Sequence, residues 1–392
     1  MQFILRNRPF IVVWLAVLIS IAGIGMVSPL LAKFAEEMGA TGSWLGLIFS
    51  GYAFTQIPLM PVVGRLADRF GKKLFLSLGL LVYAMAAAGY LWAPGYRELF
   101  LFRLLSGAGA AMVIPTAYAY IGELTPQGRE GRYMGLFNIA LVAGYGIGPT
   151  LGGVVYDGFG MDATFASMCI MSGIGFLVVL LLLPAGTSTA RPLPDKSPAV
   201  GFSTLLKDQT MRGVITYHLM WGLGYGAVFT FLPIFLTTVR GTSLAQVGIL
   251  LSVRSVLNGT LNYPYGWLAD RMNRVLLVSV GVVMMAAGIF LIPWVGGFVA
   301  ILILFAAMGI FETIAMPAVS AITVDCGRKL GMGLVMSVYN MAASSAVIVG
   351  AMAGAAIEGY VGITWVFPAA AGGILVGAAV FNIFMSQARK SG

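Results

Sequence analysis

The fold of this chain is decided by a short sequence that occurs twice. The first copy is Gly64-Arg-Leu-Ala-Asp68-Arg69, and the second, 202 residues later, is Gly266-Trp-Leu-Ala-Asp270-Arg271. The same offset relates polar and glycine positions outside the two copies: Gln56 and Asn258, Glu123 and Asp325, Asn138 and Asn340, Gly148 and Gly350. A constant register over so long a stretch indicates an internal duplication. We therefore predict two homologous halves.

The composition is that of a membrane protein. Of the 392 residues, 59% are hydrophobic and 9% are charged, and the mean hydropathy is +0.94. Charged residues make up about a quarter of a typical globular chain, so a soluble enzyme is excluded. The two cysteines, Cys169 and Cys326, are too few for a disulfide framework or a cysteine-based metal site. We expect neither a metal nor a cofactor.

Long apolar runs predict twelve transmembrane helices in two six-helix bundles. A hydrocarbon core about 30 Å thick needs about 20 apolar residues per helix. The runs are continuous rather than alternating, which favours helices over a β-barrel. A segment rich in Pro, Ser and Thr divides them six and six, so we predict an N-terminal bundle at 1–183, a cytoplasmic linker at 184–212 and a C-terminal bundle at 213–392. The predicted spans are 10–33, 44–64, 73–93, 98–122, 132–156, 163–183, 213–238, 244–266, 274–294, 298–325, 331–358 and 363–386.

The basic residues predict the orientation of these spans. With a cytoplasmic N-terminus, the cytoplasmic segments hold 18 of the 23 Lys and Arg residues, as the positive-inside rule requires. Both termini are then cytoplasmic, and the first span is a retained helix rather than a signal peptide. The net charge of +9 reports this topology rather than nucleic-acid binding. We expect a monomer in the cytoplasmic (inner) membrane of a bacterium.

The sequence resembles the major facilitator superfamily over essentially its full length. The loop Gly64-Arg-Leu-Ala-Asp68-Arg69-Phe-Gly71-Lys72-Lys73 is similar to the loop signature of that superfamily, and Arg103-Leu-Leu-Ser-Gly107-Ala-Gly109 is similar to its buried-arginine motif. The fifth span carries Gly144-Tyr-Gly-Ile-Gly148-Pro149-Thr-Leu-Gly152-Gly153, which resembles the antiporter motif of the twelve-span drug:proton antiporters. The resemblance implies the major facilitator fold, alternating access and the export direction. The small-xxx-small spacing also suits plain helix packing.

A gating latch is predicted at the cytoplasmic ends of the spans. Asp68 lies where a helix leaves the membrane, and a carboxylate there can accept hydrogen bonds from the N-terminus of a neighbouring helix. The alternatives are plain positive-inside charge for the basic residues and a solvated loop carboxylate for Glu123 and Asp325. The second copy has Asn273 where the first has Gly71. The candidate latch residues are Gly64, Asp68, Arg69, Lys72, Glu123, Arg129, Asp270, Arg271 and Asp325.

Two charges lie near the middle of spans, Glu312 in the tenth and Arg254 in the eighth. A charge at the bilayer centre costs about 2.5–3.5 kcal/mol on insertion scales, so it needs a partner or an aqueous cavity. Because burial raises a carboxyl pKa and a nearby cation lowers it, an alternating environment lets Glu312 take up and release a proton. A permanent structural pair with Arg254 and direct binding of a cationic substrate are the alternatives.

Other side chains within the spans are candidates for coupling or for lining a cavity. Arg103 is either held by backbone carbonyls of the first span, as the resemblance implies, or extends to the interface. His218 is the only histidine; the unperturbed pKa of a histidine lies near neutrality, and His218 is either a coupling or a structural group. Aromatic packing and helix–helix hydrogen bonding are the alternatives for the candidate cavity residues Tyr217, Trp221, Tyr225, Gln56, Asn258, Asn138 and Asn340.

We expect a proton-coupled secondary transporter that exports small amphipathic or drug-like molecules. The sequence has no Gly-x-x-x-x-Gly-Lys-Ser/Thr loop, so ATP is not expected to drive it. The first span has no acid before Glu36, whereas several drug antiporters place a carboxylate in the N-terminal half. The alternatives are a symporter or uptake carrier for a polar or anionic metabolite, with Arg254 as counter-charge, and, in another class, a non-transporting membrane sensor or lipid scramblase.

Overall fold

The fold was obtained as a computed structural model, which describes residues 7–27, 30–40, 43–184, 205–242 and 244–391. Within these ranges the chain is helical and has no strands, so the predicted all-α class is confirmed. Most of the predicted linker, residues 185–204, lies outside the described residues. The second half begins with a capped helix: the Asp208 side chain accepts a hydrogen bond from the Met211 N–H at 2.8 Å, which satisfies one of the free amides of the first turn.

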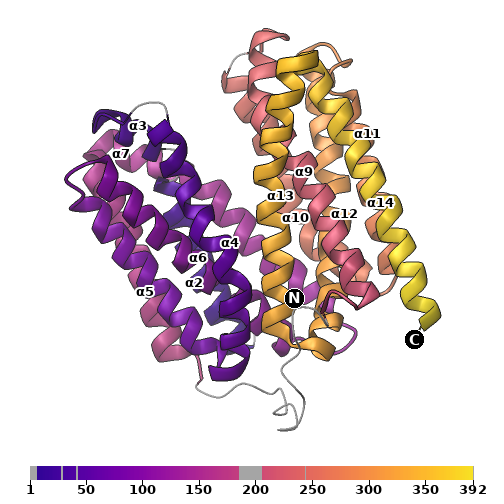
Figure 1. Cartoon of the computed structure of the whole chain (residues 1–392), viewed down its shortest axis with the longest axis horizontal. Helices are drawn as coiled ribbons and strands as arrows, with labels where there is room; N and C mark the ends of the chain where they lie inside the picture. The colour runs from indigo at the N-terminus through magenta and orange to yellow at the C-terminus, as the bar shows by residue number, and fades with distance from the viewer. Residues whose placement is uncertain (1–6, 28–29, 41–42, 185–204, 243, 392) are drawn as a thin grey trace. The chain divides into compact units, whose positions relative to one another are not determined.

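Figure 1 shows the described helices in their order along the chain. They are α2 (Arg8–Val27), α3 (Leu31–Glu37), α4 (Ser43–Phe70), α5 (Lys72–Leu91), α6 (Tyr96–Leu124), α7 (Glu130–Leu182), α9 (Gln209–Thr238), α10 (Leu244–Ala269), α11 (Arg274–Leu291), α12 (Phe298–Leu330), α13 (Met332–Val361), the 3₁₀ turn η1 (Ile363–Trp365) and α14 (Val366–Ser391).

The described helices accommodate the twelve predicted spans. Nine are long and apolar enough to cross a membrane by length and composition. Helix α7 has 53 residues and is broken at Gly160, where φ is 82°, so it covers the two predicted spans at 132–156 and 163–183. Helices α4 and α10, with 28 and 26 residues, exceed the length of about 20 residues that a bilayer requires. The first predicted span differs, because α2 ends at Val27 and α3 begins at Leu31.

The described chain forms two compact units. Unit 1 holds residues 1–125 and 139–197, together with 327–337 from the end of α12 and the first turns of α13. Unit 2 holds residues 126–138 from the start of α7, and 198–326 and 338–392. Each unit thus contains one helix start contributed by the other half of the sequence.

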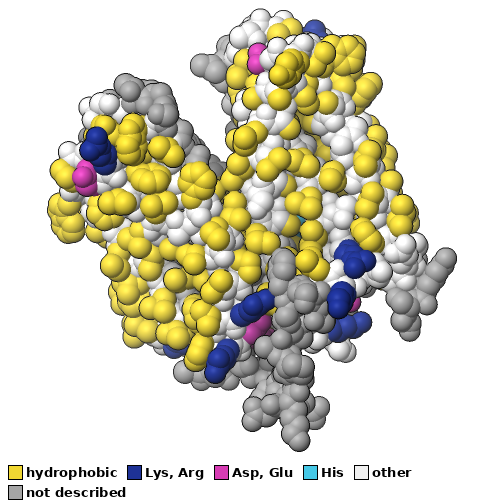
Figure 2. Space-filling model, in the orientation of Figure 1, with side chains coloured by type: hydrophobic (Ala, Val, Ile, Leu, Met, Phe, Trp, Pro, Cys, Tyr) yellow, Lys and Arg dark blue, Asp and Glu magenta, His cyan; other side chains and the backbone are white. Residues whose placement is uncertain are grey.

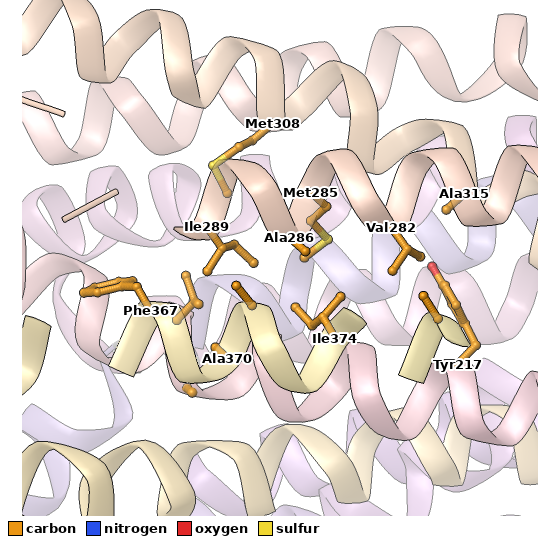
Figure 3. Close-up of a cluster of buried hydrophobic side chains, with 14 of the residues drawn as sticks. Tyr217, Val282, Met285, Ala286, Ile289, Met308, Ala315, Phe367, Ala370 and Ile374 are labelled. Atoms are coloured by element: carbon orange, nitrogen blue, oxygen red, sulfur yellow. The ribbon is translucent and has the colours of Figure 1, made fainter. Parts of the chain in front are cut away.

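The core of unit 2 is built from α9, α11, α12 and α14 (Figure 3). Met285 and Ile289 of α11 lie in the same buried cluster as Phe367 and Ile374 of α14. Because lipid tails are as apolar as these side chains, close packing rather than exclusion of water holds such helices together.

Large apolar side chains are exposed on both units. Figure 2 shows hydrophobic side chains over most of the visible face. The exposed side chains include Trp92 at the end of α5, Trp294 after α11 and Trp365 at the start of α14. Tryptophan is enriched where a membrane meets water. The apolar helices and exposed aromatic residues are those of a multi-pass membrane protein.

Candidate functional site

Asp68 holds the first turn of α13 within unit 1. Its Oδ1 accepts a hydrogen bond from the Gly333 N–H at 2.8 Å, and its Oδ2 accepts one from the Leu334 N–H at 3.0 Å. These amides have no partner within their own helix, and the positive end of the helix dipole favours the carboxylate. The Lys72 ammonium donates to Asp68 at 2.8 Å and to Glu123 at 2.6 Å.

Glycine allows the close approach that this contact needs. A Cβ atom at Gly333 would lie 2.6 Å from Asp68 Oδ1, and one at Gly64 would meet the Gly333 carbonyl oxygen and the Ser337 side chain. The turn that separates Asp68 from Lys72 passes through Gly71, whose φ of 98° is a conformation that favours glycine.

The same arrangement occurs in unit 2, with the same 202-residue offset. Asp270 Oδ1 accepts a hydrogen bond from the Gly131 N–H at 2.7 Å, and Oδ2 accepts two from Arg132, its backbone N–H at 3.3 Å and its Nε at 3.0 Å. Burial raises the pKa of the Asp270 carboxyl above its usual value, and these hydrogen bonds and the charges of Arg132 and Arg274 offset part of that effect. Arg274 donates to Glu130 at 2.8 Å and to Asp325 at 2.6 Å.

Two predicted latch arginines lie over aromatic rings. The Arg69 guanidinium lies 5.2 Å from the Phe70 ring centroid, and the Arg271 guanidinium lies 3.9 Å from the Trp267 ring centroid. Arg129 is exposed.

Three residues of these contacts are not among the candidate latch residues: Glu130, Arg132 and Arg274. The repeat held a signal for Arg274, because it lies 202 residues after Lys72. Asn273, which replaces Gly71, has φ −63° and caps α11: its Oδ1 accepts hydrogen bonds from the Val275 and Leu276 N–H groups at 3.0 and 3.4 Å. A side-chain cap here takes the place of the glycine turn.

Arg254 and Glu312 form a buried ion pair in unit 2. The guanidinium donates from Nε at 2.9 Å and from Nη2 at 2.7 Å, and both bonds go to Glu312 Oε2. The two side chains are 10% and 11% exposed. Among the described residues, Oε1 of Glu312 accepts no hydrogen bond.

An aromatic ladder on α9 lies beside this pair. The rings of Trp221 and Tyr225 stack with centroids 4.9 Å apart, and those of Tyr225 and Phe229 stack at 5.5 Å. The Arg254 guanidinium lies 5.7 Å from the Tyr225 centroid. Tyr217 lies in the core cluster instead (Figure 3), 7% exposed, so the ladder extends one turn further along α9, to Phe229, than the sequence reasoning placed it.

The remaining polar candidates are packed within helices and against neighbours. His218 is buried, its Nδ1 lies 3.0 Å from the Val214 carbonyl oxygen, and its ring centroid lies 4.1 Å from that of Tyr339. Asn258 accepts hydrogen bonds from the Asn262 Nδ2 through its carbonyl and its side-chain oxygen. Among the other predicted cavity residues, the buried ones are Gln56 and Asn138, and the half-buried one is Asn340.

Arg103 of unit 1 does not have the partners that the resemblance implied. Its side chain is buried, with the residue 7% exposed. The guanidinium lies 4.9 Å from the Tyr52 ring centroid, and its buried Nε has no hydrogen-bond partner. Within the described part of the chain it donates to no carbonyl of α2, and the Tyr52 ring of α4 lies over one face of the guanidinium.

Three glycines of the antiporter-like motif form a seam between α7 and α2. A Cβ atom at Gly144 would lie 2.9 Å from Ile21 Cβ, one at Gly148 would lie 2.6 Å from the Ala22 carbonyl oxygen, and one at Gly152 would meet the Met26 backbone. These glycines therefore face α2 at direct backbone contact. Pro149 touches the same seam near Gly25, whereas a Cβ atom at Gly153 would meet nothing within 4 Å.

Comparison with curated proteins identifies relatives among transporters. The chain is 25% identical over 346 residues to an uncharacterized MFS-type transporter of Methanocaldococcus jannaschii, a match that covers 87% of this chain and 89% of the relative. It is 28% identical over 200 residues to the quinolone resistance protein NorA of Staphylococcus aureus, which covers 51% of this chain and 49% of NorA.

Solved structures share the fold. The human organic anion transporter MFSD10 superimposes with a TM-score of 0.78 at 19% identity, covering 96% of this chain and 99% of that one. The FucP transporter in its outward conformation superimposes with a TM-score of 0.79 at 18% identity, covering 96% and 98%, and FucP is a fucose:proton symporter of E. coli.

The sequence profile of the Major Facilitator Superfamily matches residues 13–253 and 235–391, which is most of the chain. The match covers both repeated halves and agrees with the all-helical fold. The chain is a membrane transporter rather than an enzyme, and it belongs to the Major Facilitator Superfamily.

Proposed function

We propose that this transporter is proton-coupled and exports small amphipathic molecules across the cytoplasmic membrane by alternating access. The N-terminal bundle (1–183) and the C-terminal bundle (213–392) are the two moving parts, and both termini are cytoplasmic. The observation that carries the proposal is the geometry of the Arg254–Glu312 pair.

Glu312 is suited to take up a proton without losing its partner. Both Arg254 nitrogens converge on Oε2, so the second carboxylate oxygen is available to a proton. Protonation at Oε1 removes the negative charge while the hydrogen bonds to Oε2 remain, in weaker form. The positive charge of the buried arginine is then no longer balanced by a negative charge. The protonated and deprotonated states therefore favour different surroundings.

The aromatic ladder supports an amphipathic cargo. The stacked rings of Trp221, Tyr225 and Phe229 lie beside the ion pair. They place apolar aromatic surface next to a polar group. Ligand sites combine apolar walls with a few placed polar groups in this way.

The two carboxylate–helix contacts support a cytoplasmic gate. Asp68 and Asp270 each bind the first-turn amides of a helix from the other half of the sequence. We propose that these contacts form and break during the transport cycle.

The proposal is tested by Glu312→Gln in proteoliposomes, with a ligand first selected by thermal-shift screening at two pH values. The variant is expected to lose uptake driven by a pH gradient while it still exchanges bound ligand. The matched control is Glu358→Gln, because Glu358 is exposed on α13. Gradient-driven flux that is unchanged in Glu312→Gln rejects the coupling role.

Direction is tested separately, and NorA homology over half the chain favours export. Inside-out vesicles with an acidic lumen are expected to accumulate the ligand. If the ligand accumulates only when protons and ligand move into the vesicle from the same side, the protein is a symporter.

A further inference from the structure

Among the described residues, the lysines and arginines that are buried are Lys72, Arg103 and Arg254. Lys72 and Arg254 each have a carboxylate partner. Arg103 forms no ion pair within the described ranges, and its Nε has no hydrogen-bond acceptor. An ionised group that is buried without a partner is strongly unfavourable, so the site is complete only when something negative is present.

No carboxylate in the described part of unit 1 forms an ion pair with Arg103. Asp68 and Glu123 form ion pairs with Lys72. Asp157 and Asp162 are exposed near the break in α7. Arg103 lies seven residues after Tyr96, about 10 Å along α6 from its first residue.

Phenol groups surround the unpaired guanidinium. Tyr52 stacks under it, and the Tyr52 and Tyr83 hydroxyls lie 3.3 Å apart. Tyr145 of α7 lies near Tyr52 and Arg103, and 49% of the residue is exposed. These hydroxyls are additional hydrogen-bond donors near the guanidinium.

Tight helix packing fixes this arrangement. Gly107, one turn after Arg103, lies directly against the Tyr52 carbonyl oxygen, and a Cβ atom at Gly51 would lie 2.9 Å from the Phe100 ring. The position of the Tyr52 ring under Arg103 is therefore set by the α4–α6 contact.

We infer that Arg103, with Tyr52, Tyr83 and Tyr145, is a binding subsite for the carboxylate of an amphipathic organic acid. Arginine binds carboxylates through parallel N–H donors. The inference rests on the transport function proposed above and names the class of its cargo.

The test measures equilibrium binding to protein in phosphatidylcholine nanodiscs, with empty nanodiscs as the baseline. The probes are acid–amide pairs of matched shape: benzoate and benzamide, 2-naphthoate and 2-naphthamide, laurate and lauramide. The wild type is expected to bind the acid of at least one pair about tenfold to a hundredfold more tightly than its amide, the ratio that a charge-assisted hydrogen bond supplies. Arg103→Gln removes this preference and leaves amide binding unchanged.

The control is Arg97→Gln, the same substitution at an exposed position of α6, which keeps the preference. Tyr52→Phe removes one hydrogen-bond donor, and it lowers the affinity for the acids but not for the amides. This variant tests the inference if Arg103→Gln does not fold. The inference is overturned if the wild type binds acid and amide with equal affinity or binds no probe. It is also overturned if the preference for the acid survives Arg103→Gln or is unchanged in Tyr52→Phe. Because no gradient is applied, this result is independent of Glu312 and of the direction of transport.

Discussion

Asp68→Asn isolates the contact that holds the start of α13. The asparagine has nearly the same shape, but it keeps only one acceptor oxygen and presents an NH₂ group where Asp68 accepts a second N–H. One of the two bonds to Gly333 and Leu334 is therefore lost, and the other is reduced to a neutral hydrogen bond. Lys72 keeps only Glu123 as its anionic partner.

The magnitude follows from these bonds. A hydrogen bond to a charged group contributes about 1.5–3 kcal/mol and a neutral one about 0.5–1.5 kcal/mol. Because the Asp68 side chain is 25% exposed, solvent screening reduces the total, and we expect a loss of about 2–4 kcal/mol in the local stability of this turn. That loss corresponds to an increase of about 30- to 700-fold in local opening.

Hydrogen exchange measured by mass spectrometry in nanodiscs reads this opening directly at residues 333 and 334. Peptides from α14 should keep their protection, which shows that the fold is intact. Asp157→Asn is the matched control, since Asp157 is exposed on α7. Unchanged protection at Gly333 and Leu334 in Asp68→Asn would refute the view that this carboxylate holds the helix N-terminus.

Three further sets of variants probe other contacts. Gly148→Ala should cost about 1–3 kcal/mol by overpacking and lower the apparent Tm, whereas Gly153→Ala, which has open space, should not; equal effects would contradict the α2–α7 seam. Arg254→Met and Glu312→Gln should each cost about 3–5 kcal/mol, and the double variant should recover most of the apparent Tm; additive losses would show that the pair is not coupled. Asn273→Ala should reduce the stability of the first turn of α11 by about 0.5–2 kcal/mol, and Asn273→Gly by only a few tenths; hydrogen exchange measures both, and equal losses would exclude a side-chain cap.

The repeat accounts for the equivalence of the two carboxylate–helix contacts. Asp68 and Asp270 stand at equivalent positions, and the amides that they bind, at 131 and 333, differ by the same 202 residues. One duplicated sequence therefore specifies both contacts. The candidate sites within the spans lack this symmetry: Arg254 occupies the position equivalent to Tyr52, so each unit has a different buried cation and a different set of aromatic neighbours.

The sequence by itself determined the membrane class, the spans, the duplication and the charged residues that needed partners, because apolar length, periodicity and unusual charges are properties of the chain. The tertiary structure decided which groups meet. The backbone amides of Gly333 and Leu334 carry no signature in the sequence, and the separation of Tyr217 from the ladder depends on how α9 is rotated against α14. Whether a buried cation finds a carboxylate, as Arg254 does, or an aromatic ring, as Arg103 does, depends on which helix faces it, and only helix packing sets that.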